Sequence, residues 1–252
     1  MIAPRIRAMA APHWLALFGG ILVAWGALWL MALPGEMREA ASIYGLEFWA
    51  ALCRVGPEGS GFAGLLAMWT LMAGGMMAPT ALPAFATYDD LSHTGETRFG
   101  ALIAGYLAVW IGFAAVAAGL QTGLYRLGLV DALGTSLSPM LSGVLLVAAG
   151  AYQFSPLKDA CLSRCRAPLT FFMAHWAEGP WRMGLRLGLT CLGCCAALML
   201  LAFVGGVMSL GFMALGMVLM TLEKLPQIGR YVTRPLGVGL IAGGLWSAMQ
   251  VF

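Results

Sequence analysis

The chain has 252 residues, of which 61% are hydrophobic and 10% are charged, and its mean hydropathy is +0.85. Soluble domains carry about 25% charged residues, so this composition excludes a water-soluble globule. It also excludes a disordered protein, because a chain this apolar collapses or enters lipid. The formal net charge of +3 is too small for a nucleic-acid-binding surface. We therefore expect an integral membrane protein whose surroundings are a lipid bilayer.

Seven apolar runs approach the length of about 20 residues that crosses a bilayer. They lie at 14–33, 62–85, 99–120, 137–154, 185–206, 207–222 and 236–252. The Gly205-Gly206 pair predicts a tight turn between the fifth and sixth runs, and six spans is the alternative count. The expected fold class is all-α, a single polytopic bundle over residues 1–252 with about seven transmembrane helices.

The basic residues predict the orientation of this bundle. Arg5 and Arg7 precede the first run, as basic residues do in a signal peptide. The apolar region of a signal peptide has about 7–15 residues, and the first run is longer. We therefore expect the first helix to remain in the protein as a membrane anchor. With a cytoplasmic N-terminus, eleven of the fourteen basic residues lie inside, as the positive-inside rule requires. The predicted location is the bacterial inner membrane. The outer loop that follows carries an amphipathic pattern near 36–54, which predicts a helix lying on the outer surface.

The centres of the apolar runs carry no acidic, basic or histidine side chain. Ion-coupled carriers mark their pathways with such groups, so the sequence argues against that class. His13, His93 and His175 all fall at the edges of the runs, which argues against a haem between two transmembrane histidines. No nucleophile elbow, phosphate-binding loop or dinucleotide fingerprint occurs, so most familiar enzyme classes are excluded.

Five of the six cysteines lie in one third of the chain. Cys191, Cys194 and Cys195 stand at positions i, i+3 and i+4, which share one face of a helix. Counted from the inner end of the fifth run, they lie about 9–15 Å deep at 1.5 Å per residue. Cys161 and Cys165 share a face if a helix begins at Pro156, as a proline at the first helical position indicates.

Thiolate is the form of cysteine that binds metals, and Cu(I) prefers cysteine and methionine ligands. The reducing cytoplasm disfavours structural disulfides on this side of the membrane. The five cysteines therefore predict a site for a soft ion, copper or alternatively zinc. A buried cysteine also serves as a small hydrophobe, and this is what we expect of Cys53.

Methionines reach the same depth on the second helix. Met72, Met76 and Met77 approach the inner leaflet just before Pro79, where we expect the helix to break. We interpret them as auxiliary metal ligands, with core filling as the alternative. Asp89 and Asp90 then fall in an expected solvated loop.

Tyr152, Gln153 and Lys158 surround the inner end of the fourth helix. We interpret them as anchors at the membrane interface, a role that tyrosine and lysine commonly have, and lining of a cytoplasmic vestibule is the alternative.

These motifs together resemble a bacterial domain-of-unknown-function family of predicted metal-binding integral membrane proteins. The resemblance covers roughly residues 62–226 and rests on Met76-Met77-Ala78-Pro79, Gly150-Ala151-Tyr152-Gln153, Pro156-Leu157-Lys158, Cys161-Leu162, Cys165-Arg166, Cys191-Leu192-Gly193-Cys194-Cys195 and Glu223-Lys224. It implies a multi-helix membrane protein with a metal site at the cysteines and no assigned activity. Ala196 departs from the aromatic residue expected after the double cysteine.

Three functional hypotheses follow. The first is a metal-handling protein, a transporter, chaperone or insertion factor for a membrane metalloenzyme, which uses the five cysteines with Met72, Met76 and Met77. The second is an enzyme, a membrane thiol oxidoreductase in which Cys194 or Cys195 exchanges electrons with Cys161 or Cys165. The third is a structural subunit of a larger membrane complex, with close helix contacts at the pairs Gly119 and Gly123, Gly184 and Gly188, and Gly239 and Gly243.

Overall fold

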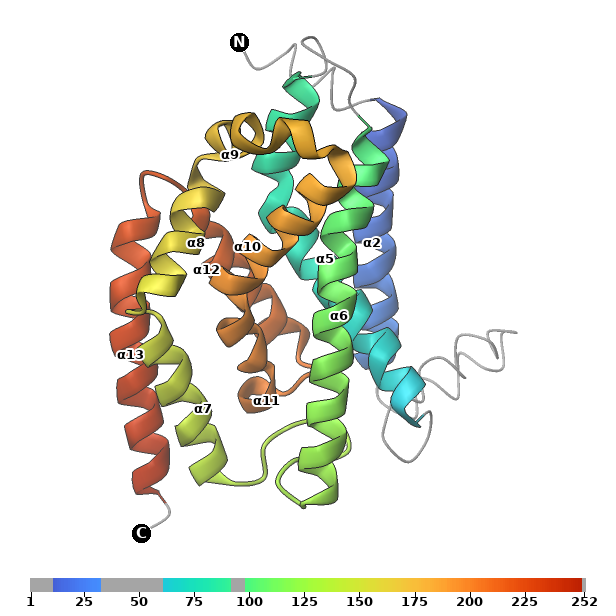
Figure 1. Ribbon diagram of the computed structural model, residues 1–252. Helices are drawn as coiled ribbons and strands as arrows, with labels where there is room; N and C mark the ends of the chain where they lie inside the picture. The colour runs from blue at the N-terminus through green and yellow to red at the C-terminus, as the bar shows by residue number, and fades with distance from the viewer. Residues whose placement is uncertain (1–10, 33–60, 92–97, 251–252) are drawn as a thin grey trace, which may run out of the picture.

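The computed structural model describes residues 11–32, 61–91 and 98–250. Within these ranges the regular structure is helical, apart from one isolated bridge between Val130 and Ser136. The long helices run up and down along a common axis (Figure 1). In chain order the α-helices are α2 (Pro12–Ala32), α5 (Gly61–Asp90), α6 (Phe99–Arg126), α7 (Pro139–Tyr152), α8 (Pro156–Arg166), α9 (Pro168–His175), α10 (Pro180–Leu200), α11 (Ala202–Gly205), α12 (Leu210–Lys224) and α13 (Gly229–Met249), of which α9 and α11 are short. The surface helix expected near 36–54, Cys53 and His93 lie outside the described residues.

Each of the seven apolar runs coincides with one or more of these helices, so the all-α prediction is confirmed. Four of them are long and apolar enough to cross a membrane: α2, α5, α6, and α10 together with α11. The pair α7 and α8, bent by 62°, adds a fifth if it forms one span. Neither α12 nor α13 is among them, so the count of seven crossings stays a prediction.

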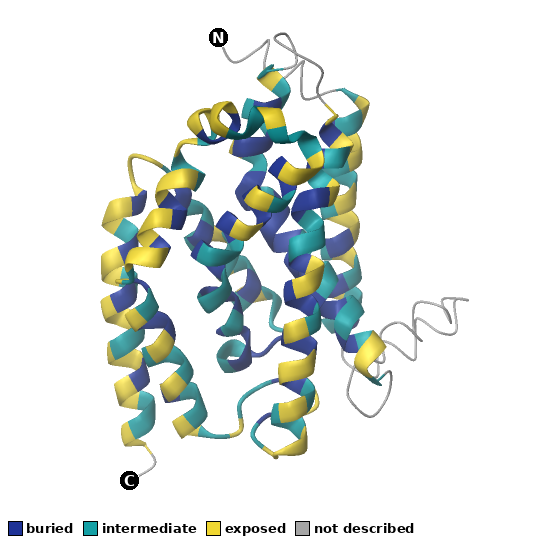
Figure 2. Ribbon diagram, in the orientation of Figure 1, coloured by how far each residue is buried: buried dark blue, intermediate teal, exposed yellow. Residues whose placement is uncertain are grey.

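The core of the bundle lies between α5, α6, α10 and α12, and exposed residues lie mainly on the outer faces (Figure 2). Many of these exposed side chains are apolar, as Leu22, Val116 and Leu189 illustrate. Soluble proteins avoid extended apolar surfaces of this kind. The outer faces therefore suit contact with lipid tails.

The tightest contact between long helices joins α6 to α10, where two glycines let the backbones touch. A Cβ atom on Gly184 would collide with the carbonyl oxygen of Leu102, and one on Gly105 would collide with that of Trp181. Small residues permit this approach between helices in lipid. Of the three paired-glycine patterns, only that of Gly184 and Gly188 lies at a close contact; the other four glycines have open space beside them.

Helix α5 continues through Pro79 and Pro83 to Asp90, so the expected break at Pro79 is wrong. Proline lacks an N–H group and leaves the carbonyl four residues earlier without its helical donor. That carbonyl belongs to Gly75, and it accepts a hydrogen bond of 3.0 Å from Nε1 of Trp25 in α2. The neighbouring helix thus supplies the missing donor and the helix persists.

The expectation of a solvated loop at Asp89 and Asp90 is also wrong, because both residues belong to the last turn of α5. The Asp89 carboxylate accepts a 2.8 Å hydrogen bond from Nε1 of Trp14 and lies 3.3 Å from the ring of His13. These contacts attach the end of α5 to the start of α2.

The predicted turn at Gly205-Gly206 is confirmed. Helix α11 ends at Gly205, and Gly206 adopts φ of +88°, a conformation that residues with a side chain rarely adopt. The Ser209 side chain then accepts from the backbone N–H of Phe212 and caps α12. The chain therefore reverses, and α12 runs back beside α10 toward the upper end in Figure 1.

Helix α8 begins where the sequence indicates, with Ser155 as its N-cap and Pro156 at the first helical position. It packs against α10. This brings the two cysteines of α8 beside the three of α10.

Candidate metal centre

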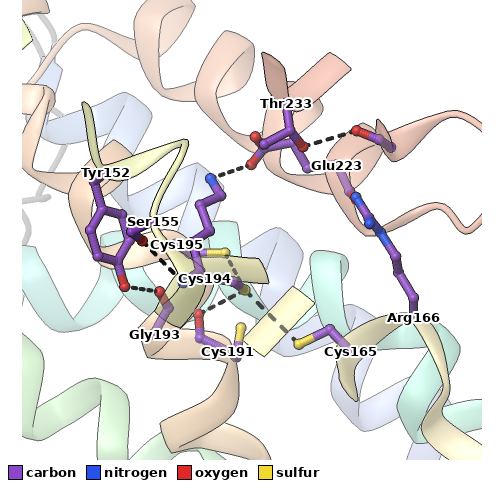
Figure 3. A network of polar contacts seen from close by, with 12 residues as sticks. Tyr152, Ser155, Cys165, Arg166, Cys191, Gly193, Cys194, Cys195, Glu223 and Thr233 are labelled. Atoms are coloured by element: carbon purple, nitrogen blue, oxygen red, sulfur yellow. Dashed lines mark hydrogen bonds and ion pairs between the residues drawn. The ribbon is translucent and has the colours of Figure 1, made fainter. Parts of the chain in front are cut away.

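Three cysteines of α10 form a compact group of sulfur atoms. The Sγ atoms of Cys191, Cys194 and Cys195 all lie within 4.8 Å of one another, and each side chain is at most 2% exposed. Cys194 is central, with its sulfur 3.3 Å from that of Cys195 and 3.1 Å from the carbonyl oxygen of Cys191 (Figure 3). The spacing in the sequence thus brings three sulfurs together, as predicted.

The two cysteines of α8 lie against α10 at different places. The Sγ atom of Cys165 is 3.9 Å from that of Cys194. The Sγ atom of Cys161 packs against Gly193, so closely that a Cβ atom there would lie 2.5 Å from it. All five cysteines are free thiols. Cys165 therefore extends the group of three, while Cys161 fills the space that the glycine leaves.

The side chain of Lys224 enters the group from the last turn of α12. Its Nζ atom donates to Sγ of Cys191 at 3.0 Å and to Oγ1 of Thr80 at 2.6 Å, and the residue is 8% exposed. A buried ammonium group needs an anionic or polar partner, and a neighbouring positive charge favours the thiolate that binds metals. Lys224 therefore gives the sulfur group a fixed positive neighbour.

Helix α5 contributes hydrogen-bonding groups through the main chain at Met77. The Met77 carbonyl accepts from the hydroxyl of Tyr106 at 2.9 Å and from that of Thr80 at 2.9 Å. The Tyr106 oxygen also lies 3.1 Å from Sγ of Cys191. The sulfur of Cys191 is thus contacted by Tyr106 of α6 and by Lys224 of α12. Thr80 of α5 acts on it only indirectly, by accepting from Lys224.

The predicted methionine ligands are buried on α5, with Met72 at 1%, Met76 at 4% and Met77 at 0% exposure. The methyl group of Met76 faces α12, where it lies beside Gly216. Metal ligation by the three thioethers stays a prediction.

A buried ion pair lies beside the sulfur group. Nζ of Lys158 is 2.8 Å from Oε2 of Glu223, and both side chains are 1% exposed. Arg166 donates through Nε and Nη2 to the main-chain carbonyl of Glu223, at 2.9 and 2.6 Å (Figure 3). This satisfies a carbonyl in the last turn of α12 that lacks a helical donor. The end of α12 is therefore joined to α8 by two separate contacts.

The interpretation of Lys158 as an interfacial anchor is wrong, because it is fully buried and paired. Tyr152 likewise points inward and donates its hydroxyl hydrogen to the carbonyl of Gly193 (Figure 3). Both residues hold α7 and α8 to the neighbouring helices.

A pocket of about 300 Å³ reaches the sulfur group and is lined by residues near the ends of α5, α8 and α12. Its inner wall includes Tyr106, Cys191 and Lys224, and Cys165 also lines it. The exposed residues Pro83 and Pro226 lie at its outer edge. A small solute therefore has a path to the cysteines between the ends of α5, α8 and α12.

Sequence reasoning missed Lys224 and Tyr106 as neighbours of Cys191, and Thr80 as a neighbour of Lys224. The pair Glu223-Lys224 contributes to the sequence-based prediction only as one of the motifs of the family resemblance, yet two charges at the end of an apolar helix are costly unless each has a partner. The cost of burying these two charges could have indicated that Glu223 and Lys224 each have a buried partner. Which partner each charge takes depends on how the helices are rotated against one another.

A protein-family model described as PpoB2, copper chaperone, matches residues 66–247. The match covers the sulfur group, Lys224, Lys158 and Glu223. Comparison with curated proteins and with solved structures gave no significant match.

Proposed function

The chain belongs to the PpoB2 copper chaperone family, and we propose that it is a membrane-embedded chaperone that receives Cu(I) on its cysteines and passes it to a metalloprotein. The observation that carries this proposal is the convergence of three buried sulfurs from α10 within 4.8 Å. Soft thiolates select Cu(I) over hard cations such as Mg²⁺ and Ca²⁺.

The positive charge of Lys224 beside the cysteines favours a monovalent ion over a divalent one. Two thiolates with Cu(I) carry a net charge of minus one, and the ammonium group of Lys224 beside Cys191 balances it. A site that is neutral overall avoids the cost of burying net charge. The same two thiolates with Zn²⁺ and Lys224 would leave a net charge of plus one, whereas zinc would need all three cysteines as thiolates for a neutral site. Ligation by two thiolates, with the third cysteine kept as a thiol, therefore favours copper.

We propose a location in the bacterial inner membrane, with the upper end of Figure 1 in the cytoplasm. The helices α6, α10 and α13 begin at that end, and α8 and α12 finish there. Basic residues are concentrated in these turns, namely Arg98, Arg164, Arg166, Arg182, Arg186, Lys224, Arg230 and Arg234, whereas Arg126 ends α6 at the other end. This distribution supports the positive-inside orientation. In that orientation the proposed copper exchange takes place on the cytoplasmic side.

Elemental analysis of the purified chain tests the proposal. After loading with Cu(I) under reducing conditions, we expect the wild type to hold copper. We expect the variant with Cys191→Ser, Cys194→Ser and Cys195→Ser to hold none. X-ray absorption at the copper edge should show sulfur coordination in the wild type.

A control variant carries Ala196→Ser and Ala197→Ser, which add hydroxyl groups to the same helix without removing sulfur. It should retain the copper of the wild type. If the wild type and the three-serine variant hold equal copper, or both hold only zinc, the proposal is wrong.

The contact of 3.9 Å between the sulfurs of Cys165 and Cys194 favours a second candidate, the thiol oxidoreductase. In that case the two thiols would form a disulfide when oxidised, with loss of two protons and two electrons to an external acceptor. Alkylation in intact membranes under oxidising and reducing buffers separates the candidates. Labelling that is independent of the redox buffer excludes the enzyme.

The acceptor protein, and a role within a larger complex, remain proposals. Gly239 and Gly243 are exposed on α13 with open space beside them, a surface that suits a further helix. Native mass measurement of the gently solubilised protein tests for a stable partner.

A further inference from the structure

Cys165 differs from the other described cysteines in its access to solvent. Cys161, Cys191, Cys194 and Cys195 are at most 8% exposed, whereas Cys165 is partly exposed. It also lines the pocket that opens at the ends of α5, α8 and α12. Among the cysteines within residues 11–32, 61–91 and 98–250, it is therefore the one that a solute arriving through the pocket meets first.

Cys165 is also close enough to the buried group to pass on an ion. Its sulfur lies 3.9 Å from that of Cys194, which in turn lies 3.3 Å from that of Cys195. The sulfurs thus form a short chain from the partly exposed position to the buried one (Figure 3). An ion bridging Cys165 and Cys194 needs only a small further movement to reach the three thiols of α10.

The neighbouring residue fixes where Cys165 stands. Arg166 makes two hydrogen bonds to the carbonyl of Glu223, and Lys158 pairs with the carboxylate of the same residue. Both contacts attach α8 to the end of α12. The last turn of α8 is therefore held at the side of the pocket, with Cys165 facing Cys194.

We propose that Cys165 is the transfer ligand through which Cu(I) enters and leaves the group of Cys191, Cys194 and Cys195. The inference rests on the proposed function, because it assumes that those three cysteines hold copper. The incoming substrate is Cu(I) bound to two small thiols. Cys165 differs in role from the three buried cysteines, because it binds copper only during exchange.

Each step exchanges one sulfur for another without electron transfer. The sulfur of Cys165 bonds to Cu(I), one carrier thiolate leaves, and that thiolate takes the proton that Cys165 loses. Cys194 then displaces the second carrier thiol in the same way. In the last step Cys191 or Cys195 replaces Cys165 on the ion, and Cys165 recovers a proton from the incoming thiol.

The test measures copper exchange rates on the full-length protein in detergent or lipid discs. Loading starts from Cu(I) bound to glutathione, and unloading is followed by the absorbance of the chelator bathocuproine disulfonate. We expect Cys165→Ala to slow both rates by about tenfold or more, the effect of about 1.4 kcal/mol in the barrier. The amount of copper bound at equilibrium should not change. Cys165→Met, which restores a soft sulfur, should recover part of the rate.

Ser163→Ala serves as the matched control, since Ser163 is an exposed residue of the same helix, and it should exchange copper at the wild-type rate. Three results would overturn the proposal: wild-type rates in Cys165→Ala, loss of equilibrium copper in that variant, or equal slowing by Cys161→Ala. Failure of the proposed function gives a different result from failure of the role of Cys165. If the proposed function is wrong, the variant with Cys191→Ser, Cys194→Ser and Cys195→Ser binds as much copper as the wild type.

Discussion

The two ends of the bundle bury polar groups in very different ways. At the lower end in Figure 1, Trp69 donates a 2.8 Å hydrogen bond to Gln121, packed against the rings of Phe113 and Phe203. At the upper end the helices bury a lysine–glutamate pair, a second lysine and four of the five described cysteines. Burial of each charge is costly. At the lower end the hydrogen bond between Trp69 and Gln121 joins α5 to α6 without a buried charge. The upper end therefore carries a cost of charge burial that the contact at the lower end avoids.

The largest expected effect comes from breaking the ion pair at the upper end. Lys158→Met leaves the Glu223 carboxylate buried without its cation, a change that typically costs about 3–5 kcal/mol of the free energy of unfolding. Thermal unfolding in detergent measures it. Adding Glu223→Leu should recover most of the loss, because two apolar residues replace the pair. A double variant as unstable as the single one would mean that the pair is not the cause.

Removing the lysine beside the sulfurs should weaken copper binding. Lys224→Met deletes a charged hydrogen bond to Cys191, and such bonds contribute about 1.5–3 kcal/mol. We therefore expect the affinity for Cu(I) to fall by roughly 10- to 150-fold, measured by competition with a chelator. Thr80→Val removes the other acceptor of Lys224 and a donor to the Met77 carbonyl but leaves the ammonium group in place, so it should have a smaller effect. Equal affinities in Lys224→Met and the wild type would exclude an electrostatic role for Lys224.

The corresponding change at the lower end should affect stability alone. Gln121→Leu leaves Nε1 of Trp69 buried without an acceptor, at a cost of about 1–3 kcal/mol. The copper content of the purified variant should match that of the wild type. Loss of copper in Gln121→Leu would contradict the separation of the two ends.

The smallest effect is expected for a glycine of α6 near the lower end. Gly119 has open space around it, and alanine stabilises a helix relative to glycine by about 0.5–1 kcal/mol, so Gly119→Ala should be neutral or slightly stabilising.

At the contact between α6 and α10, Gly184→Ala should instead destabilise the protein by about 1–3 kcal/mol, because the two backbones must separate. Comparison of the two unfolding temperatures checks both.

The convergence of Cys191, Cys194 and Cys195 was predictable because it depends on the geometry of one helix, where residues three and four apart share a face. The start of α8 at Pro156 and the turn at Gly205-Gly206 were predictable for the same reason. Each depends on residues that are neighbours in the sequence.

The contacts between helices were not predictable in this way. Lys224 and Cys191 are 33 positions apart, and their meeting depends on the rotation and depth of α12 relative to α10. Pro79 shows the same limit, since the rule that proline breaks a helix fails where Trp25 of another helix supplies the missing donor. Local patterns therefore located the sulfurs but not their charged neighbours.

Glu223 and Lys224 are consecutive residues whose side chains leave α12 about 100° apart, one toward Lys158 and the other toward Cys191. A turn of this helix about its own axis would therefore pull on both attachments together. A rotation that moves the ammonium group away from the sulfur therefore also strains the link to α8. The position of Cys165 and the charge next to Cys191 are thus mechanically coupled through two adjacent residues.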